Sequence, residues 1–101
     1  MVITVTRIDG DGSVLTRTVD TAGRQDSGRW TELAEQAELH MPPPYRPQPG
    51  EAVYRIQAGG LSATVAERDL QGALRELSIA VLVEGDPGGT DQQLRAAPPY
   101  E

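Results

Sequence analysis

The sequence contains no cysteine, lysine, asparagine or phenylalanine. Without cysteine the chain can form neither disulfides nor thiolate metal sites. Without lysine it lacks the residue that P-loop phosphate sites require, so the Gly-Gly pairs at 59–60 and 88–89 do not indicate phosphate loops. Lysine, asparagine and phenylalanine have AT-rich codons, and their absence together with nine arginines indicates a bacterial genome of high GC content.

Positive charge is also scarce, since the formal net charge is −6. A chain without a basic stripe is not expected to bind nucleic acid or an anionic membrane. No apolar run approaches the ~20 residues of a membrane span, and the chain opens on a strand pattern rather than a leader, so we expect a cytoplasmic protein. The charge favours a neutral or basic protein partner through steering, or simply keeps a small protein soluble.

The first twenty residues have the pattern of a β-hairpin. Apolar and polar residues alternate over residues 2–8, and many of them are β-branched, which predicts a strand. Residues 9–12 read Asp-Gly-Asp-Gly and predict a turn, because such pairs tolerate the positive φ angles of tight turns. A second strand is expected over about 13–20, antiparallel to the first.

A short helix and a proline-rich connection follow. Apolar residues recur at the spacing of one helical face: Trp30, Leu33, Ala34 and Ala37. Asp26 or Ser27 can cap the start of this helix, and the prolines at 42–44 require it to end before them. Five of the nine residues from 42 to 50 are proline, which predicts an ordered, semi-rigid connection.

The second half of the chain repeats the order of hairpin and helix. Strands are expected over Val53–Ala58 and Leu61–Ala66, on either side of a Gly59-Gly60 turn. Asp69 is expected to cap a second helix over about 70–83. Its apolar stripe comprises Leu70, Ala73, Leu74, Leu77 and Val81.

These elements predict an α+β fold. Two hairpins would form a four-stranded antiparallel sheet, and two helices on one face would complete a two-layer domain. We expect residues 1–83 to form this single domain, because a chain of this length builds one small core. Residues 84–101 contain many breakers and few apolar side chains, so they are expected to form a flexible C-terminal tail.

Residues that could support catalysis are isolated in the sequence. His40 is the single histidine, with no second ligand or nucleophile nearby, so we expect its role to be structural or incidental. The Asp9–Gly12 turn is similar to a calcium loop, but it lies between strands and lacks the glutamate of an EF-hand. No serine lies in a Gly-x-Ser-x-Gly elbow. The sequence therefore predicts a protein without enzymatic activity, cofactor or metal.

One combination of motifs resembles a known family. It consists of Trp30-x-x-Leu33…Leu39, then Pro42-Pro43-x-Tyr45-Arg46-Pro47-x-Pro49-Gly50, then Tyr54-x-Ile56 with the Gly59-Gly60 hairpin, and a closing Leu74…Leu77 helix. This pattern resembles emfourin, the small protein inhibitor of protealysin and related thermolysin-like metallopeptidases. The resemblance covers about residues 1–83. The first hairpin departs from the family, which commonly has a glycine pair and a phenylalanine in that turn; the departure bears on potency and target choice.

The resemblance implies an inhibitor that binds a thermolysin-like zinc protease 1:1 and occludes its active-site cleft. The zinc belongs to the protease, and the free inhibitor is expected to be a monomer. We expect the contacts to come from exposed, rigid loops: Asp9, Gly10, Asp11, Gly12, Pro43, Tyr45, Arg46, Gly59, Gly60 and Leu61. Asp9 or Asp11 could approach the zinc, and Leu61 could enter the pocket for large apolar side chains. The alternative is a non-catalytic bacterial protein-interaction or regulatory module with another protein partner.

Overall fold

The sheet has five antiparallel strands in the order β4-β3-β1-β2-β5. β1 (Val2–Ile8) is central, between β2 (Val14–Asp20) and β3 (Val53–Ala58). β4 (Leu61–Ala66) forms one edge, and the two-residue β5 (Asp86–Pro87) lies at the other. The first four strands match those predicted from the sequence, and β5 is an addition to the predicted sheet.

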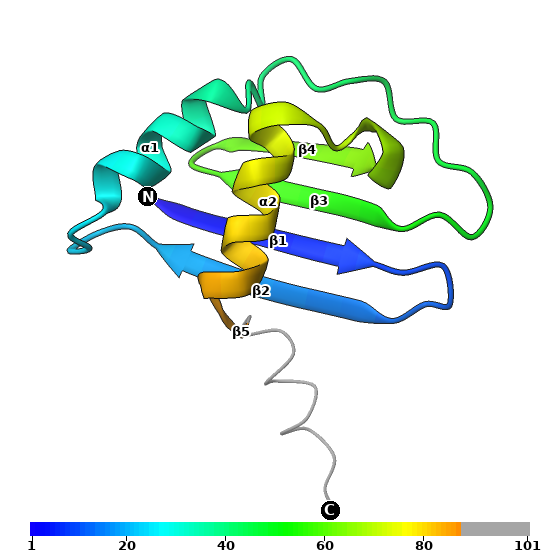
Figure 1. The fold of residues 1–101 in the computed structure, drawn as a ribbon, viewed down its shortest axis with the longest axis horizontal. Coiled ribbons are helices and arrows are strands. Elements are labelled where there is room, and N and C mark those ends of the chain that lie inside the picture. Colours follow the sequence, from blue (N-terminus) through cyan, green and yellow to red (C-terminus); the bar gives the residue numbers. More distant parts are fainter. Residues whose placement is uncertain (88–101) are drawn as a thin grey trace, which may run out of the picture.

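Two helices cover one face of this sheet (Figure 1). They are α1 (Ser27–Gln36) and α2 (Gly72–Glu84), and a short 3-10 turn, η1 (Glu67–Asp69), connects β4 to α2. The computed structural model describes residues 1–87. The α+β, two-layer architecture expected from the sequence is confirmed.

Strand register determines which side chains face the helices. Ile3 of β1 pairs with Val19 of β2 and with Ala58 of β3, and these three side chains are buried beneath the helices. Thr4 and Thr6 alternate with the core residues of β1 and therefore face the other side of the sheet. Their hydroxyl oxygens lie 3.2 and 3.3 Å from those of threonines 18 and 16 across the strand pair.

The core forms between the sheet and the predicted stripes of the two helices. On α1, Trp30 is fully buried and Leu33 nearly so, whereas Ala34 is only partly buried. On α2, Leu77 is fully buried and Leu74 nearly so. Apolar burial of this kind is the dominant favourable contribution to folding, so the two helical stripes hold the layers together.

The start of α2 differs from the prediction. Asp69 does not cap this helix but ends η1, and Gln71 occupies the N-cap position of α2. Leu70, predicted as the first apolar residue of the helix, is extended (φ −83°, ψ 91°) and buried. The chain therefore buries Leu70 before the helix begins, and Gly72 adopts a φ of 60° at the change of direction.

Residues 84–87 continue the domain, which corrects the prediction that the tail begins at residue 84. Glu84 ends α2, and β5 pairs with β2. Gly85 permits this connection because a Cβ there would lie 2.6 Å from the Val81 carbonyl oxygen. Pro87 is compatible with a strand because it lies at the edge of the sheet. The remainder of the predicted tail, residues 88–101, lies outside the described residues.

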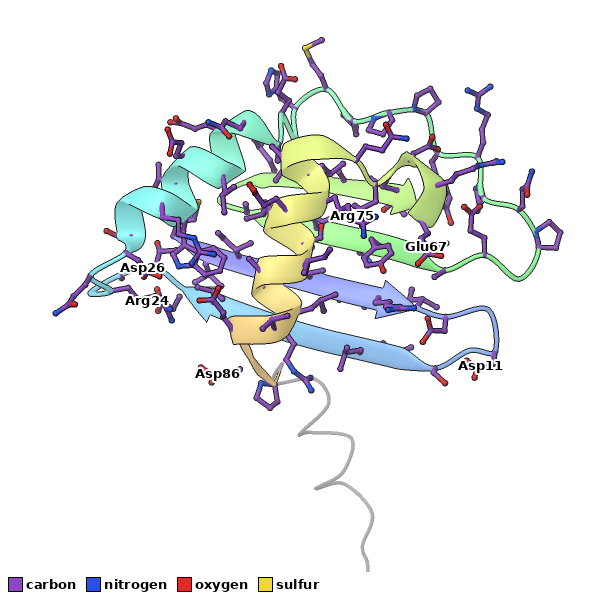
Figure 2. The ribbon with its side chains drawn as sticks, in the orientation of Figure 1. Asp11, Arg24, Asp26, Glu67, Arg75 and Asp86 are labelled. Carbon is purple, nitrogen blue, oxygen red and sulfur yellow. The ribbon has the colours of Figure 1, made fainter. Side chains whose placement is uncertain are left out.

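A cluster of charged side chains joins the start of α1 to the end of α2. Asp26 occupies the predicted N-cap position, but its carboxylate accepts hydrogen bonds from Trp30 Nε1 (3.1 Å) and Arg24 Nε (2.9 Å) instead of capping the backbone (Figure 2). Arg29 lies over the Trp30 ring, 4.9 Å from its centroid. The same arginine pairs with Glu84 of α2 at 3.1 Å. Asp26 therefore orients the buried tryptophan.

This cluster predicts a pH dependence of stability. The hydrogen bonds from Arg24 and then from Trp30 lower the pKa of Asp26. A carboxylate with a lowered pKa in the folded chain contributes stability above its unfolded pKa of about 3.9 and loses it as the pH falls through the folded value. The difference in unfolding free energy between wild type and Asp26→Asn should therefore shrink between about pH 5 and pH 2. Urea denaturation at several pH values measures this difference in unfolding free energy. A difference that does not change with pH would contradict the lowered pKa of Asp26.

Candidate functional site

The β1–β2 turn is held by its own hydrogen bonds. The Asp9 N–H donates to the Ser13 carbonyl oxygen (2.8 Å), and the Gly12 N–H donates to the Asp9 carbonyl oxygen (2.9 Å). Gly12 has a φ of 92°, which glycine adopts without strain. The Asp11 carboxylate accepts the Ser13 N–H at 2.8 Å and closes a local Asx turn. The tip is therefore rigid although it is exposed.

The two carboxylates of this turn differ in their partners. Asp9 accepts a hydrogen bond from Arg7 Nε at 2.8 Å, so its charge is compensated. Asp11 lies at the tip of the turn (Figure 2), where hydrogen bonds from the backbone and side chain of Ser13 lower its pKa. Asp11 consequently stays ionised to a lower pH than a free aspartate. Among residues 1–87 no arginine pairs with it, so its charge is directed to solvent or to a partner.

The connection between α1 and β3 returns to the sheet against this turn. A Cβ built on Gly10 would lie 2.7 Å from the carbonyl carbon of Gly50 and 2.8 Å from its Cα. The backbones approach so closely only because residue 10 has no Cβ. Gly50 itself adopts a φ of 82°, which favours glycine. The end of the proline-rich connection therefore supports the β1–β2 turn, and the two segments form one surface at one end of the sheet (Figure 1).

Hydrogen bonds anchor the same connection to η1. Glu51 accepts the backbone N–H groups of Gln48 (2.9 Å) and Arg68 (3.0 Å), which together lower the pKa of its carboxyl. The Arg68 guanidinium donates to the carbonyl oxygen of Arg46 at 2.6 Å. Tyr45 remains half-exposed next to this anchor. These contacts agree with the ordered connection predicted from its prolines.

The β3–β4 turn lies at the opposite end of the sheet. Gly59 has a positive φ of 61°, whereas the φ of Gly60 is not positive. This is the pattern of a type II′ turn. Because β1 and β3 are antiparallel, the tip at Gly59 and the tip at Gly10 are separated by the length of a strand. Six residues at about 3.3 Å each correspond to about 20 Å.

A mostly apolar cavity of about 360 Å³ lies between α1 and the β3–β4 turn. It is lined by Met1, Thr31, Ala34, Glu35, Leu39, His40, Ala58 and Leu61. Leu61 and Met1 are 48% and 40% exposed, so the cavity opens to solvent between apolar groups. Within the described part of the chain, no group of three or more histidine, aspartate or glutamate residues could hold a metal ion.

The sequence-predicted binding residues therefore divide between two ends of the sheet. Residues 9–12 lie at one end, beside Gly50, and residues 59–61 lie at the other. Pro43, Tyr45 and Arg46 belong to the connection that passes between them (Figure 1). Sequence reasoning missed the role of Gly50 and the cavity, because both depend on residues that are distant in the chain. The local signal of a close backbone approach is Gly10 itself, because a side chain there would clash with the Gly50 backbone.

The contact between the two glycines gives a testable prediction. Gly10→Ala should lower the free energy of unfolding by about 1–3 kcal/mol, because the methyl group must displace the Gly50 backbone. Gly60→Ala is the matched control: it also lies in a hairpin turn, but its Cβ would meet nothing within 4 Å, so a change within about 0.5 kcal/mol is expected. Chemical denaturation compares them, and equal losses would contradict the supporting role of Gly50.

Comparisons with known proteins leave the site to be interpreted from its own geometry. The chain matches no family model, and no curated protein or solved structure is significantly similar to it. Neither helix within residues 1–87 has the length and hydropathy needed to cross a membrane.

Proposed function

We propose that this protein inhibits a thermolysin-like zinc metalloprotease by occluding its active-site cleft in a 1:1 complex. The observation that carries the proposal is the rigid β1–β2 turn, which is supported by Gly50 and presents the ionised Asp11 at its tip. The similarity of the sequence pattern to emfourin supports the same function. Neither the turn nor its support requires a metal or cofactor of the chain's own.

A rigid, exposed turn suits an inhibitor for energetic reasons. Ordering a mobile loop at an interface reduces the net binding energy, whereas a turn held by its own hydrogen bonds avoids this cost. Carboxylate oxygens are ordinary zinc ligands, so Asp11 has the chemistry to approach the metal of a protease. Asp9 is less suited, because Arg7 already neutralises it.

The proposal assigns the cleft to one end of the molecule. Leu61 follows the opposite turn, and at about 20 Å from the first turn it does not enter the same narrow cleft as Asp11. The Gly50 end of the proline-rich connection, which contacts Gly10, is the second segment expected at the protease surface. The exposed apolar residues at the other end of the sheet, Met1 and Leu61, are then available for a different contact.

The test is a titration of the purified protein into a thermolysin-like protease, with a fluorogenic peptide as substrate. Stoichiometric loss of peptide cleavage, unchanged when zinc is added, is expected for occlusion. Recovery of activity by added zinc would indicate removal of the metal and contradict this mechanism. The decisive assay uses a thermolysin-like protease encoded near this protein in the same genome. Full activity of that protease in a large excess of the protein would overturn the inhibitor proposal.

The alternative function is a non-catalytic interaction or regulatory module with another partner. The cavity between α1 and the β3–β4 turn favours it, because open apolar cavities are common sites for a partner's side chain. A module of this kind would leave the protease active in the same titration.

A further inference from the structure

One edge of the sheet has unpaired backbone groups. β4 pairs with β3 on one side, and no described strand lies on the other. Ala58 and Leu61 flank a two-residue turn and form a hydrogen-bonded pair, so Ser62 and Thr64 direct their N–H and C=O groups away from β3. Within residues 1–87 no protein hydrogen bond reaches these outward groups.

The composition of β4 leaves this edge open to pairing. Charged side chains and proline are the usual features that prevent an edge strand from pairing with another chain. The β4 sequence, LSATVA, contains neither. The other edge is different, because β5 covers part of β2 and β2 carries Arg17 and Asp20. β4 is therefore the edge suited to accept an additional strand.

The proline-rich connection passes outside β4 in Figure 1 without completing the sheet. Prolines at 42, 43, 44, 47 and 49 have no N–H to donate. No backbone hydrogen bond joins residues 41–50 to β4 in the described chain. Within residues 1–87 the connection therefore does not pair with this edge as a sixth strand.

The apolar cavity lies on the side of β4 that faces the helices. Side chains of a strand added beside β4 would alternate between the two faces of the sheet. Those next to Leu61 would point to the helix side, where Leu39 and His40 line the cavity. Its volume of about 360 Å³ is within the range of ligand pockets and accommodates a large aliphatic or aromatic side chain.

We propose that the β4 edge and this cavity form a second binding site, which takes an extended segment of a partner protein. The segment adds to the sheet as a strand, places a bulky apolar side chain in the cavity, and carries a basic residue that complements Glu35 beside it. This site lies away from the β1–β2 turn and does not rest on the inhibitor function. Where the inhibitor proposal also holds, the protein would bind two partners at the same time.

A foreign segment fits this site better than a second copy of the chain. Two copies would each bring a charge of −6 to the contact. On the helix side of β4, Ala63 and Val65 are already buried in their own core. The remaining apolar residue on that side, Leu61, lines the cavity of its own chain. The site instead favours an unfolded or edge segment that is neutral or basic.

Synthetic peptides test the site directly. The probes are acetylated and amidated octapeptides that alternate threonine with leucine, phenylalanine or alanine and carry one arginine. We expect the leucine and phenylalanine peptides to bind the full chain in isothermal titration calorimetry, at least about tenfold more tightly than the alanine peptide, a difference of about 1.4 kcal/mol. The amide signals of Ser62 and Thr64 should shift in NMR spectra of the complex.

Two variants at one position separate backbone pairing from side-chain contact. Thr64→Pro removes an outward N–H without breaking the ladder to β3, and we expect at least a tenfold loss of peptide affinity. Thr64→Val keeps the N–H and the β-branched shape, so affinity should stay within about twofold. N-methylation of the peptide at alternate residues removes the same hydrogen bonds and tests the proposal even if Thr64→Pro does not fold.

Four results would overturn the proposal. The first three are the absence of binding by every peptide at about 1 mM, unchanged binding after N-methylation in both registers, and equal losses for Thr64→Pro and Thr64→Val. Sedimentation that shows a dimer of the chain, abolished by Thr64→Pro, would assign the edge to a second copy and likewise overturn it. Protease inhibition by Thr64→Val should equal that of the wild type, so failure here is distinguishable from failure of the inhibitor function.

Discussion

Replacing Trp30 with alanine is expected to lower the free energy of unfolding by about 3–5 kcal/mol. Trp30 is the largest of the fully buried side chains. Its removal leaves a cavity between α1 and the sheet and also deprives Asp26 of the Nε1 donor. Since small domains are stable by only about 5–15 kcal/mol, this single substitution is expected to bring the protein close to unfolding.

Trp30→Phe is the control that separates burial from hydrogen bonding. Phenylalanine keeps most of the apolar volume but loses the donor to Asp26, and a smaller loss of about 1–2 kcal/mol is expected. Urea denaturation followed by far-UV circular dichroism measures both variants, because Trp30 is the one tryptophan of the chain and its fluorescence disappears with it. Equal losses for the two variants would show that burial of the ring is not the main contribution.

The strands could be predicted closely because their signals are local. In β3 and β4, alternating side chains and a two-residue glycine turn determine both the faces and the register, and the predicted bounds match the observed ones. The apolar stripe of α1 is equally local, since the spacing of Trp30 and Leu33 is enough to define its buried face.

The elements that sequence reasoning missed depend on distant contacts. Asp69 has the chemistry of a helix cap, but burial of Leu70 delays the start of α2. The breakers after Glu84 resemble the start of a tail, although Asp86 and Pro87 pair with the free side of β2. In both cases a tertiary contact overrides a correct reading of local propensity.

The candidate site shows the same limit. Exposure and rigidity could be predicted for the two turns, because both follow from glycine and aspartate in the local sequence. Which turn meets the proline-rich connection could not be predicted, since Gly10 and Gly50 are forty residues apart. This contact is what makes the first turn, rather than the second, the better candidate for the proposed contact with a protease.

Replacing Asp9, Gly10 and Asp11 together with alanine is expected to weaken inhibition of a thermolysin-like protease by at least about tenfold, or 1.4 kcal/mol. The change removes both carboxylates and the Asx turn, and it forces the backbone at Gly10 away from Gly50. Inhibition constants from the peptide-cleavage assay measure the effect. The same constants for Gly10→Ala alone show how much of the loss comes from the displaced connection.

Single substitutions then assign the effect to one carboxylate. Asp11→Asn removes the charge while its amide oxygen can still accept the Ser13 N–H, so it should reproduce most of the loss if the ionised carboxylate faces the metal. Asp9→Asn should have little effect, because Arg7 already compensates that charge. Gly60→Ala at the opposite end of the sheet is the control for unrelated changes. If the triple variant remains folded and inhibits as well as the wild type, the β1–β2 turn does not contact the protease, and the contact must be sought at the β3–β4 end.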